Sequence, residues 1–138
     1  MVSIRKMKVS DYDQALALWK RTPGMGLSAA DEKDEVRKFL KKNNALCFVA
    51  FAGRELVGTI LCGEDGRRGY LYHLAVDANC RKTGIGKSLV QKSLQALQKR
   101  GIQKCHLFVI AENAPGIAFW KHTGWQLRDD IEVMSIDL

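Results

Sequence analysis

The chain has 138 residues and a formal net charge of +7, and 46% of its residues are hydrophobic. This length and apolar content allow one compact domain over residues 1–138, with a core that needs neither metal nor disulfides. No run approaches the roughly 18 apolar residues of a membrane span, and the first residues lack a hydrophobic signal region, so we expect a soluble cytoplasmic protein.

The first elements predicted along the chain are a short strand and a helix. Residues 4–7 are typical of a strand, and Ser10, with Asp13 three residues later, is expected to cap the helix that follows. This helix carries apolar residues at helical spacing: Tyr12, Ala15, Leu16 and Trp19. Residues 22–26 contain Pro and Gly and end it.

A second helix and a pair of strands come next. Ser28 with Asp31 predicts the start of the helix. Its buried face is expected to carry Val36, Phe39 and Leu40. Residues 46–52 and 56–62 predict two antiparallel strands joined by a tight turn at Gly53. Both are apolar at successive positions, so we expect them to be covered on both faces.

The second half of the chain predicts a strand, a long helix and a parallel strand. Residues 70–77 form the first of these, and the helix begins near Gly84 and ends at Gly101, a residue suited to a left-handed C-terminal cap. The inward face of the helix is expected to carry Ile85, Leu89, Val90, Leu94 and Leu97. Residues 104–110 predict the next strand, which a right-handed crossover makes parallel to the first.

The end of the chain predicts one more helix and two strands. Asn113 is expected to cap the helix, and Pro115 helps to start it. Residues 124–126 and 131–136 predict the final strands. The whole pattern predicts a mixed sheet with helices on both faces.

Residues 81–86, Arg-Lys-Thr-Gly-Ile-Gly, join the strand at 70–77 to the long helix. Gly84 and Gly86 let the backbone approach a ligand without a Cβ in the way, so N–H groups at the helix start can point at anionic oxygens. Three side chains and the helix dipole add positive charge: Arg81, Lys82 and Lys87. A dinucleotide-binding G-x-G-x-x-G fails at Leu89, and a P-loop fails because one residue separates the glycines. The loop therefore predicts a pyrophosphate site, with a tight turn before a packed helix as the plain structural alternative.

This loop resembles the acyl-CoA loop R-x-x-G-x-G of the GNAT superfamily of N-acyltransferases. Residues 113–125 resemble the family's N-x-x-A-x-x-x-[YF]-x-x-x-G-[FW] segment in a looser form. Both segments occur in the family's order, and the resemblance is strongest from Glu55 onward. Residues 63–69 are further similar to a small bacterial YpeA-like subgroup.

The resemblance implies an α/β fold with a mixed, mostly antiparallel sheet, a central splayed pair of parallel strands, and helices on both faces. It implies acetyl-CoA as cosubstrate and no metal. The pantetheine arm is expected in the gap between the splayed strands, where a freed main-chain N–H can stabilise the tetrahedral oxyanion. The implied acetyl-CoA-binding residues are Leu74, Ala75, Val76, Arg81, Lys82, Thr83, Gly84, Ile85, Gly86, Lys87, Ser88, Asn113 and Phe119.

The acceptor amine must lose a proton during acetyl transfer. An alkylamine with a pKa near 10.4 is protonated at pH 7, and removing the proton costs about 4 to 5 kcal/mol. The candidate bases are Glu64, Asp65, Tyr72, His73, His106 and Glu112. Strand alternation places Tyr72 and His73 on opposite faces, so we expect only one of them to face the substrate. Histidine is the better base near neutral pH, while a satisfied core histidine is the plain structural alternative.

The chain departs from the family where many members carry a Tyr that protonates the departing thiolate, because Trp120 stands there. An indole N–H can donate a hydrogen bond but cannot serve as an acid. A thiolate with a pKa around 8.5 leaves without full protonation, and Tyr72, His122 or water can substitute. The candidate catalytic residues are therefore Tyr72, His73 and Trp120.

The resemblance implies transfer of acetyl from acetyl-CoA to a primary amine by direct attack in a ternary complex. The acceptor can be a small molecule or a protein or peptide amine, and a homodimer is compatible with this function. Two alternatives stay open: a non-catalytic acyl-CoA sensor or scaffold, which Trp120 favours, and a basic nucleic-acid-binding domain.

Charge and cysteine spacing bear on the remaining site classes. The net charge of +7 suits a polyanionic cofactor and does not by itself exclude nucleic acid, but no nucleic-acid motif accompanies it, which disfavours that alternative. The basic residues at 37–42 are expected to form a solvated helix face. The four cysteines lie far apart and form no C-x-x-C, which argues against a zinc or redox site.

Overall fold

The computed structural model describes residues 1–138 and divides them into two compact units, Met1–Phe108 and Val109–Leu138. The first unit contains a five-stranded sheet and three α-helices, and the second contains one α-helix. None of the helices combines the length and apolarity that crossing a membrane requires. One domain over residues 1–138 stays a prediction.

The elements follow the predicted order as far as the last strand. The strands are β1 (Val2–Lys6), β2 (Phe48–Ala52), β3 (Glu55–Glu64), β4 (Gly69–Val76) and β5 (Cys105–Leu107). The α-helices are α1 (Tyr12–Lys20), α2 (Lys33–Lys42), α3 (Ile85–Lys99) and α4 (Ala114–His122). Three 3-10 turns complete the list: η1 (Val9–Asp11), η2 (Ala29–Asp31) and η3 (Ala78–Cys80).

The sheet has the strand order β1-β2-β3-β4-β5. Strands β1 to β4 pair antiparallel, whereas β4 and β5 pair parallel. The predicted α/β class, with a mostly antiparallel sheet and one parallel pair, is confirmed. Because no strand follows β5, the parallel pair lies at the edge of the sheet and not, as predicted, at its centre.

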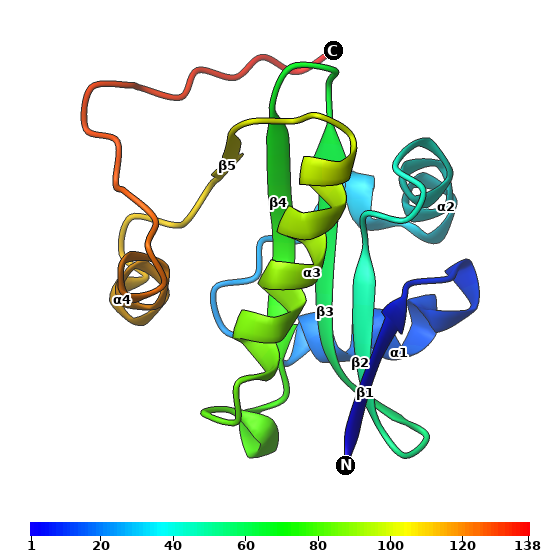
Figure 1. The fold of residues 1–138 in the computed structure, drawn as a ribbon. Coiled ribbons are helices and arrows are strands. Elements are labelled where there is room, and N and C mark those ends of the chain that lie inside the picture. The colour runs from blue at the N-terminus through cyan, green and yellow to red at the C-terminus, as the bar shows by residue number, and fades with distance from the viewer. The chain divides into compact units, whose positions relative to one another are not determined.

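Helices cover both faces of the sheet (Figure 1). On one face α3 approaches closely because two positions lack a side chain: a Cβ at Gly69 would lie 2.6 Å from Leu97, and one at Gly58 would lie 3.0 Å from Leu89. The other face packs against α1 and α2. Its core includes Met7, Tyr12, Ala15, Leu18, Trp19, Val36, Cys47, Val49, Leu56, Leu61 and Ala75.

The start of the first helix differs from the prediction. Ser10 lies inside η1 and caps nothing; instead, the carboxylate of Asp11 accepts the N–H of Lys8 at 2.8 Å. The same carboxylate pairs with the guanidinium of Arg5 at 2.8 Å. The prediction of Ser10 as the N-cap is wrong because Asp11 satisfies the free N–H group at this turn.

The predicted strands at residues 124–126 and 131–136 are absent, since no strand follows β5. Apolar residues recur there, but their side chains are exposed: Ile131, Val133, Met134 and Ile136. A β-strand gains its stability from hydrogen bonds to a partner strand. The sequence pattern reports a local preference only, and this segment forms no such pairing.

Candidate functional site

The two parallel strands separate after a short stretch of pairing. β4 pairs with β5 only from Gly69 to Leu71, whereas its other edge pairs with β3 as far as Val76. The β5-facing edge of β4 therefore has no strand partner from Tyr72 to Val76. Main-chain groups along such an edge can hold an extended ligand as an added strand does.

A β-bulge lies at the beginning of this open edge. Between the pairs Leu61↔Tyr72 and Thr59↔Ala75, β4 contains one residue more than β3. His73 takes up the extra length with a φ of +49°, in the left-handed region. This conformation costs a residue with a Cβ roughly 1 to 2 kcal/mol, so neighbouring contacts must hold it.

A buried hydrogen-bond chain supports the bulge from beneath. The indole N–H of Trp19 donates to Thr59 Oγ1 at 2.9 Å, and the Thr59 hydroxyl donates to the His73 carbonyl at 2.8 Å. Trp19 is 1% exposed and Thr59 is fully buried. Water does not compete with these bonds, which therefore fix the backbone of His73 against α1.

The bulge overturns one prediction about the site. Alternation predicted that Tyr72 and His73 lie on opposite faces, but both contact the layer formed by α1 and α2. The Tyr72 ring meets Phe39 of α2 edge-on at 6.0 Å, and the His73 ring meets Trp19 of α1 edge-on at 4.8 Å. A bulge re-aims the side chains of a strand, so a period of two no longer holds after Tyr72.

The His73 side chain is paired with a carboxylate that sequence analysis did not identify as part of the site. His73 Nε2 lies 2.6 Å from Asp31 Oδ1, and the two side chains are 14% and 12% exposed. Asp31 ends η2, where its Oδ2 accepts the N–H of Ser28 at 2.9 Å and its carbonyl accepts the Tyr12 hydroxyl at 2.6 Å. The Ser28–Asp31 capping box is therefore present, but it caps the start of η2, and α2 begins only at Lys33. The capping box was the one sequence signal that included Asp31, and it predicted the start of a helix rather than a site residue.

Tyr72 lies at the start of the open edge of β4. Burial raises the pKa of its phenol, and Tyr70, Cys62 and Cys105 raise the pKa further. The phenol thus stays protonated at neutral pH. Tyr72 is 37% exposed, so its side chain also reaches solvent.

The loop after β4 has the geometry of an anion site. Lys82 and Gly84 have left-handed φ values of +62° and +84°, and Gly84 precedes α3 without any side-chain cap. Ser88 is the first residue of α3 whose N–H finds a backbone acceptor, Gly84 O at 3.0 Å. The N–H groups of residues 85–87 therefore lack an acceptor within the chain, and their contact with a diphosphate stays a prediction.

The cationic side chains around this loop, Arg81, Lys82 and Lys87, are exposed. Thr83 and Ser88 are exposed as well. Arg81 Nε donates to the Val76 carbonyl at 3.3 Å, which ties the loop to the end of the open edge. Ile85 is different, because it is 6% exposed and packs against Gly58. Only the main chain of Ile85 can contact a phosphate.

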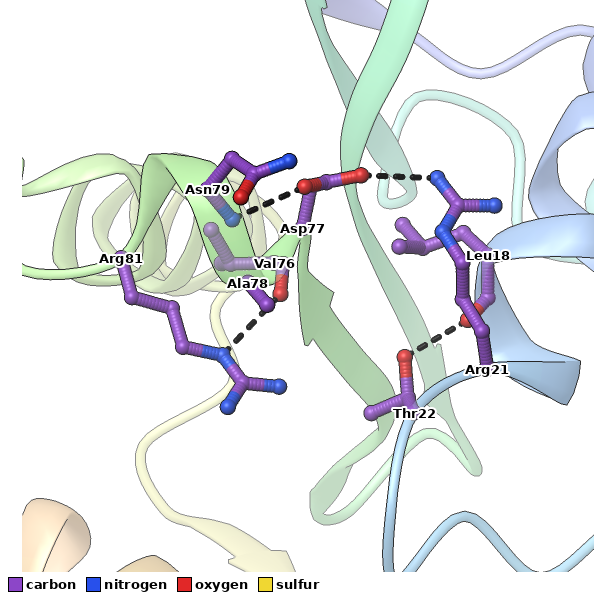
Figure 2. A pocket seen from close by; sticks show the side chains of 8 residues that line it. All are labelled: Leu18, Arg21, Thr22, Val76, Asp77, Ala78, Asn79 and Arg81. Atoms are coloured by element: carbon purple, nitrogen blue, oxygen red, sulfur yellow. Dashed lines mark hydrogen bonds and ion pairs between the residues drawn. The ribbon is translucent and has the colours of Figure 1, made fainter.

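A cavity of about 170 Å³ lies between the end of α1 and the start of this loop (Figure 2). It is lined by Leu18, Arg21, Thr22, Val76, Asp77, Ala78, Asn79 and Arg81. Asp77 accepts a hydrogen bond from Arg21 at 2.9 Å and another from the N–H of Asn79 at 2.9 Å. Both bonds lower the pKa of Asp77, and the bond from Arg21 has the larger effect. The ion pair joins α1 to the strand end next to the open edge.

Three other candidate bases make their contacts away from the open edge of β4. The Asp65 carboxylate accepts the N–H groups of Arg67 and Arg68 at 2.8 Å, and Glu64 pairs with Arg100 at 3.5 Å. Both carboxylates serve the turn between β3 and β4, at the opposite end of β4 from the anion loop (Figure 1). His106 contacts the Tyr70 ring at 5.9 Å on the paired part of the two strands.

The second unit holds the remaining predicted residues. Asn113 Oδ1 accepts the N–H of Gly116 at 3.1 Å, which confirms the predicted cap of α4. Trp120 packs edge-on against Phe119 at 5.1 Å and against Trp125 at 5.2 Å, and no residue of α4 is fully buried. The contact of Asn113, Phe119 and Trp120 with acetyl-CoA stays a prediction, as does the candidate base Glu112.

The cysteines have the properties of packing residues. Burial raises the pKa of Cys47 and of Cys105 to about 11, and it raises the pKa of Cys62 as well. All four cysteines are free, and no group of three or more His, Cys, Asp or Glu side chains is arranged to hold a metal ion. The buried thiols are thus protonated at neutral pH.

Comparison with known proteins agrees with this geometry. Residues 12–125 match the Acetyltransferase (GNAT) family. The chain is 30% identical over 134 residues to the acetyltransferase SG1711 of Sodalis glossinidius, covering 97% of this chain and 94% of that protein. The PaiA N-acetyltransferase from Thermoplasma acidophilum, solved in complex with coenzyme A, has a TM-score of 0.80 at 22% identity, covering 94% of this chain and 92% of that one. An aminoglycoside acetyltransferase from a soil metagenome, solved in complex with sisomicin, has a TM-score of 0.77 at 20% identity, covering 99% and 96%. The chain belongs to the GNAT family of acetyltransferases.

Proposed function

We propose that the chain transfers the acetyl group of acetyl-CoA to a primary amine by direct attack in a ternary complex. One observation carries this proposal: the open edge of β4, Tyr72 to Val76, is followed, after the loop at residues 77–84, by the uncapped start of α3. The edge suits an extended amide-containing arm, and the helix start suits a diphosphate. Family membership and a neighbour solved with coenzyme A support acetyl-CoA as the donor.

In this proposal the donor supplies an activated acyl thioester, and the chain holds it in three places. Main-chain groups of Leu74, Ala75 and Val76 bind the pantetheine arm. The N–H groups of residues 85–87 bind the diphosphate, assisted by exposed cations of the loop. Asn113 and Phe119 are proposed as further residues that contact acetyl-CoA.

The catalytic proposal concerns two protons. As the acceptor nitrogen bonds to the acyl carbon and the C–S bond breaks, one proton must leave the amine and one can reach the sulfur. Tyr72, protonated at neutral pH, is the proposed donor to sulfur. His73 is the proposed acceptor of the amine proton, and Trp120 is proposed to wall the thioester.

The acceptor is proposed as a small-molecule amine or a protein or peptide amine. A GNAT neighbour of known structure binds sisomicin, which supports the first class by analogy of fold alone. A cytoplasmic location and a homodimer belong to the proposal, while the YpeA-like subgroup stays a prediction.

The test is direct. Calorimetry should detect acetyl-CoA binding, and saturating acetyl-CoA should raise the melting temperature, since a ligand at 100 times its Kd adds about 2.7 kcal/mol to native stability. A panel of small amines, amino-terminal peptides and lysine peptides, followed by released CoA, should identify an acceptor. Binding without turnover of any amine would favour the sensor or scaffold, and no binding at millimolar acetyl-CoA would refute both.

A further inference from the structure

His73 is fixed at its main chain and at its ring. Its carbonyl accepts the Thr59 hydroxyl at 2.8 Å, its ring lies against Trp19, and its Nε2 lies 2.6 Å from Asp31 Oδ1. A left-handed residue persists within a strand only where its surroundings determine it, and such residues gather at active sites. His73 follows Tyr72, the first residue of the open edge of β4.

The pairing with Asp31 determines which ring nitrogen carries the hydrogen. An ionised carboxylate is an acceptor only, so the hydrogen between the two groups belongs to His73 Nε2. The neutral ring then keeps its lone pair on Nδ1. No protein group bonds Nδ1, whereas every fully buried side-chain nitrogen and oxygen has a partner. Nδ1 is therefore accessible and free to accept a proton.

Asp31 is itself held in place. Its Oδ2 accepts the N–H of Ser28 and its carbonyl accepts the Tyr12 hydroxyl, so Oδ1 is directed at the imidazole. The titratable side chain that contacts the pair is Tyr12 on α1, through its hydrogen bond to the Asp31 carbonyl. Burial raises the pKa of Tyr12, and the charges of Asp31, Glu32 and Asp13 raise it further. The carboxylate of Asp31 is the charged group that contacts the imidazole.

We infer that Asp31 is the positioning residue for a His73 general base, and that the proton-accepting atom is His73 Nδ1. This inference rests on the proposed acetyl transfer. As the C–N bond forms, the amine proton moves to Nδ1, and the carboxylate of Asp31 stabilises the imidazolium through Nε2–H. When the C–S bond has broken and Tyr72 has protonated the sulfur, the imidazolium gives its proton to solvent and Tyr72 regains one from solvent.

The decisive variants are His73→Gln and Asp31→Asn. His73→Gln should lower kcat at least about 100-fold, the lower range of general-base effects. Asp31→Asn keeps an oxygen for Ser28 but removes the charge, so it should lower kcat about 10-fold or more and move the acid limb of the pH profile down by about one unit. The KM for acetyl-CoA should stay within about twofold in both, and Asp31→Glu should restore the pH profile in part. Asp34→Asn, an exposed carboxylate on α2, is the matched control.

Nitrogen NMR of labelled histidine tests the pairing without turnover. The wild-type spectrum should show His73 as the Nε2–H tautomer, and Asp31→Asn should lower its titration midpoint. An Nδ1–H tautomer in the wild type, or an unchanged midpoint in a folded Asp31→Asn variant, would overturn the inference. Full activity of His73→Gln would also overturn the inference. This variant tests the base role even if Asp31→Asn fails to fold. A wild type that acetylates no amine would refute the proposed function and the base role with it, while the spectrum still reports on the pair.

Discussion

Asp11 shows how one carboxylate can hold a chain end against the sheet. Its side chain is 6% exposed and pairs with Arg5, which also lies over the Phe51 ring at 4.7 Å. Burial alone would raise the pKa of Asp11, but hydrogen bonds from Arg5 and from the Lys8 N–H outweigh burial and lower it. Asp11 therefore links β1 to the start of α1 in its ionised form.

Arg5→Met should lower the free energy of unfolding at pH 7 by about 2 kcal/mol, because it leaves a buried carboxylate without its charged donor. The folded pKa of Asp11 lies below the unfolded value near 3.9, so its stabilisation is complete above that value and is lost as the pH falls through the folded pKa. The difference between wild type and variant should thus shrink below about pH 4. Denaturant unfolding at pH 7 and pH 3 measures this.

Arg37→Met is the matched control for that experiment. Arg37 pairs with Asp34 on the exposed face of α2, and removal of such a pair should change stability by less than about 1 kcal/mol. Equal losses of unfolding free energy in the two variants would show that the burial of Asp11 does not strengthen its ion pair with Arg5.

Among the elements, those with strong local signals were predictable from sequence. The strand predicted at 70–77 is observed at Gly69–Val76, and the helix predicted from Gly84 to Gly101 is observed at Ile85–Lys99. Glycines and apolar periodicity report these features because both act within a few residues. The turn at Gly84 between them was predictable for the same reason, while its binding of an anion stays a prediction.

The features missed by sequence analysis depend on contacts between distant residues. The bulge at His73 needs Thr59 and Trp19, and the His73–Asp31 pair joins residues 42 positions apart. The unpaired residues 131–136 have a strand pattern without a partner strand. In each case periodicity describes one segment, whereas the outcome depends on a second segment that the pattern does not include.

The start of α3 yields a prediction at the scale of the element. Gly86→Asp should abolish detectable acetyl-CoA binding, because it puts a Cβ and a negative charge among the free N–H groups of residues 85–87. The fold should persist, since Gly86 is not among the residues with a positive φ. Calorimetry and a melting curve measure the two effects. Gln91→Asp, exposed further along α3, adds the same charge and should bind normally; retained binding in Gly86→Asp would mean that the phosphates lie elsewhere.

At the scale of the whole molecule, the cations behind the net charge of +7 differ in whether an acidic side chain pairs with them. On α2 two cations are paired with neighbouring acids, Arg37 with Asp34 and Lys38 with Glu35. The helix ends near the turn after β3, where Asn43 accepts the N–H of Glu64 at 3.2 Å. The anion loop follows the opposite end of β4 (Figure 1). A ligand at that loop is therefore expected to respond to local cations more than to total charge.

Two double variants separate local from total charge. Lys82→Gln with Lys87→Gln, and Lys41→Gln with Lys42→Gln, each reduce the net charge from +7 to +5. The first pair should weaken acetyl-CoA binding about tenfold, or about 1.4 kcal/mol, and flatten its salt dependence between about 0.1 and 1 M, where the Debye length falls from about 10 to about 3 Å. The second pair should bind like the wild type at every salt concentration. Equal weakening by both pairs would mean that the long-range field of the molecule, rather than the loop after β4, attracts the ligand, and it would remove the cations of that loop from the proposed binding set.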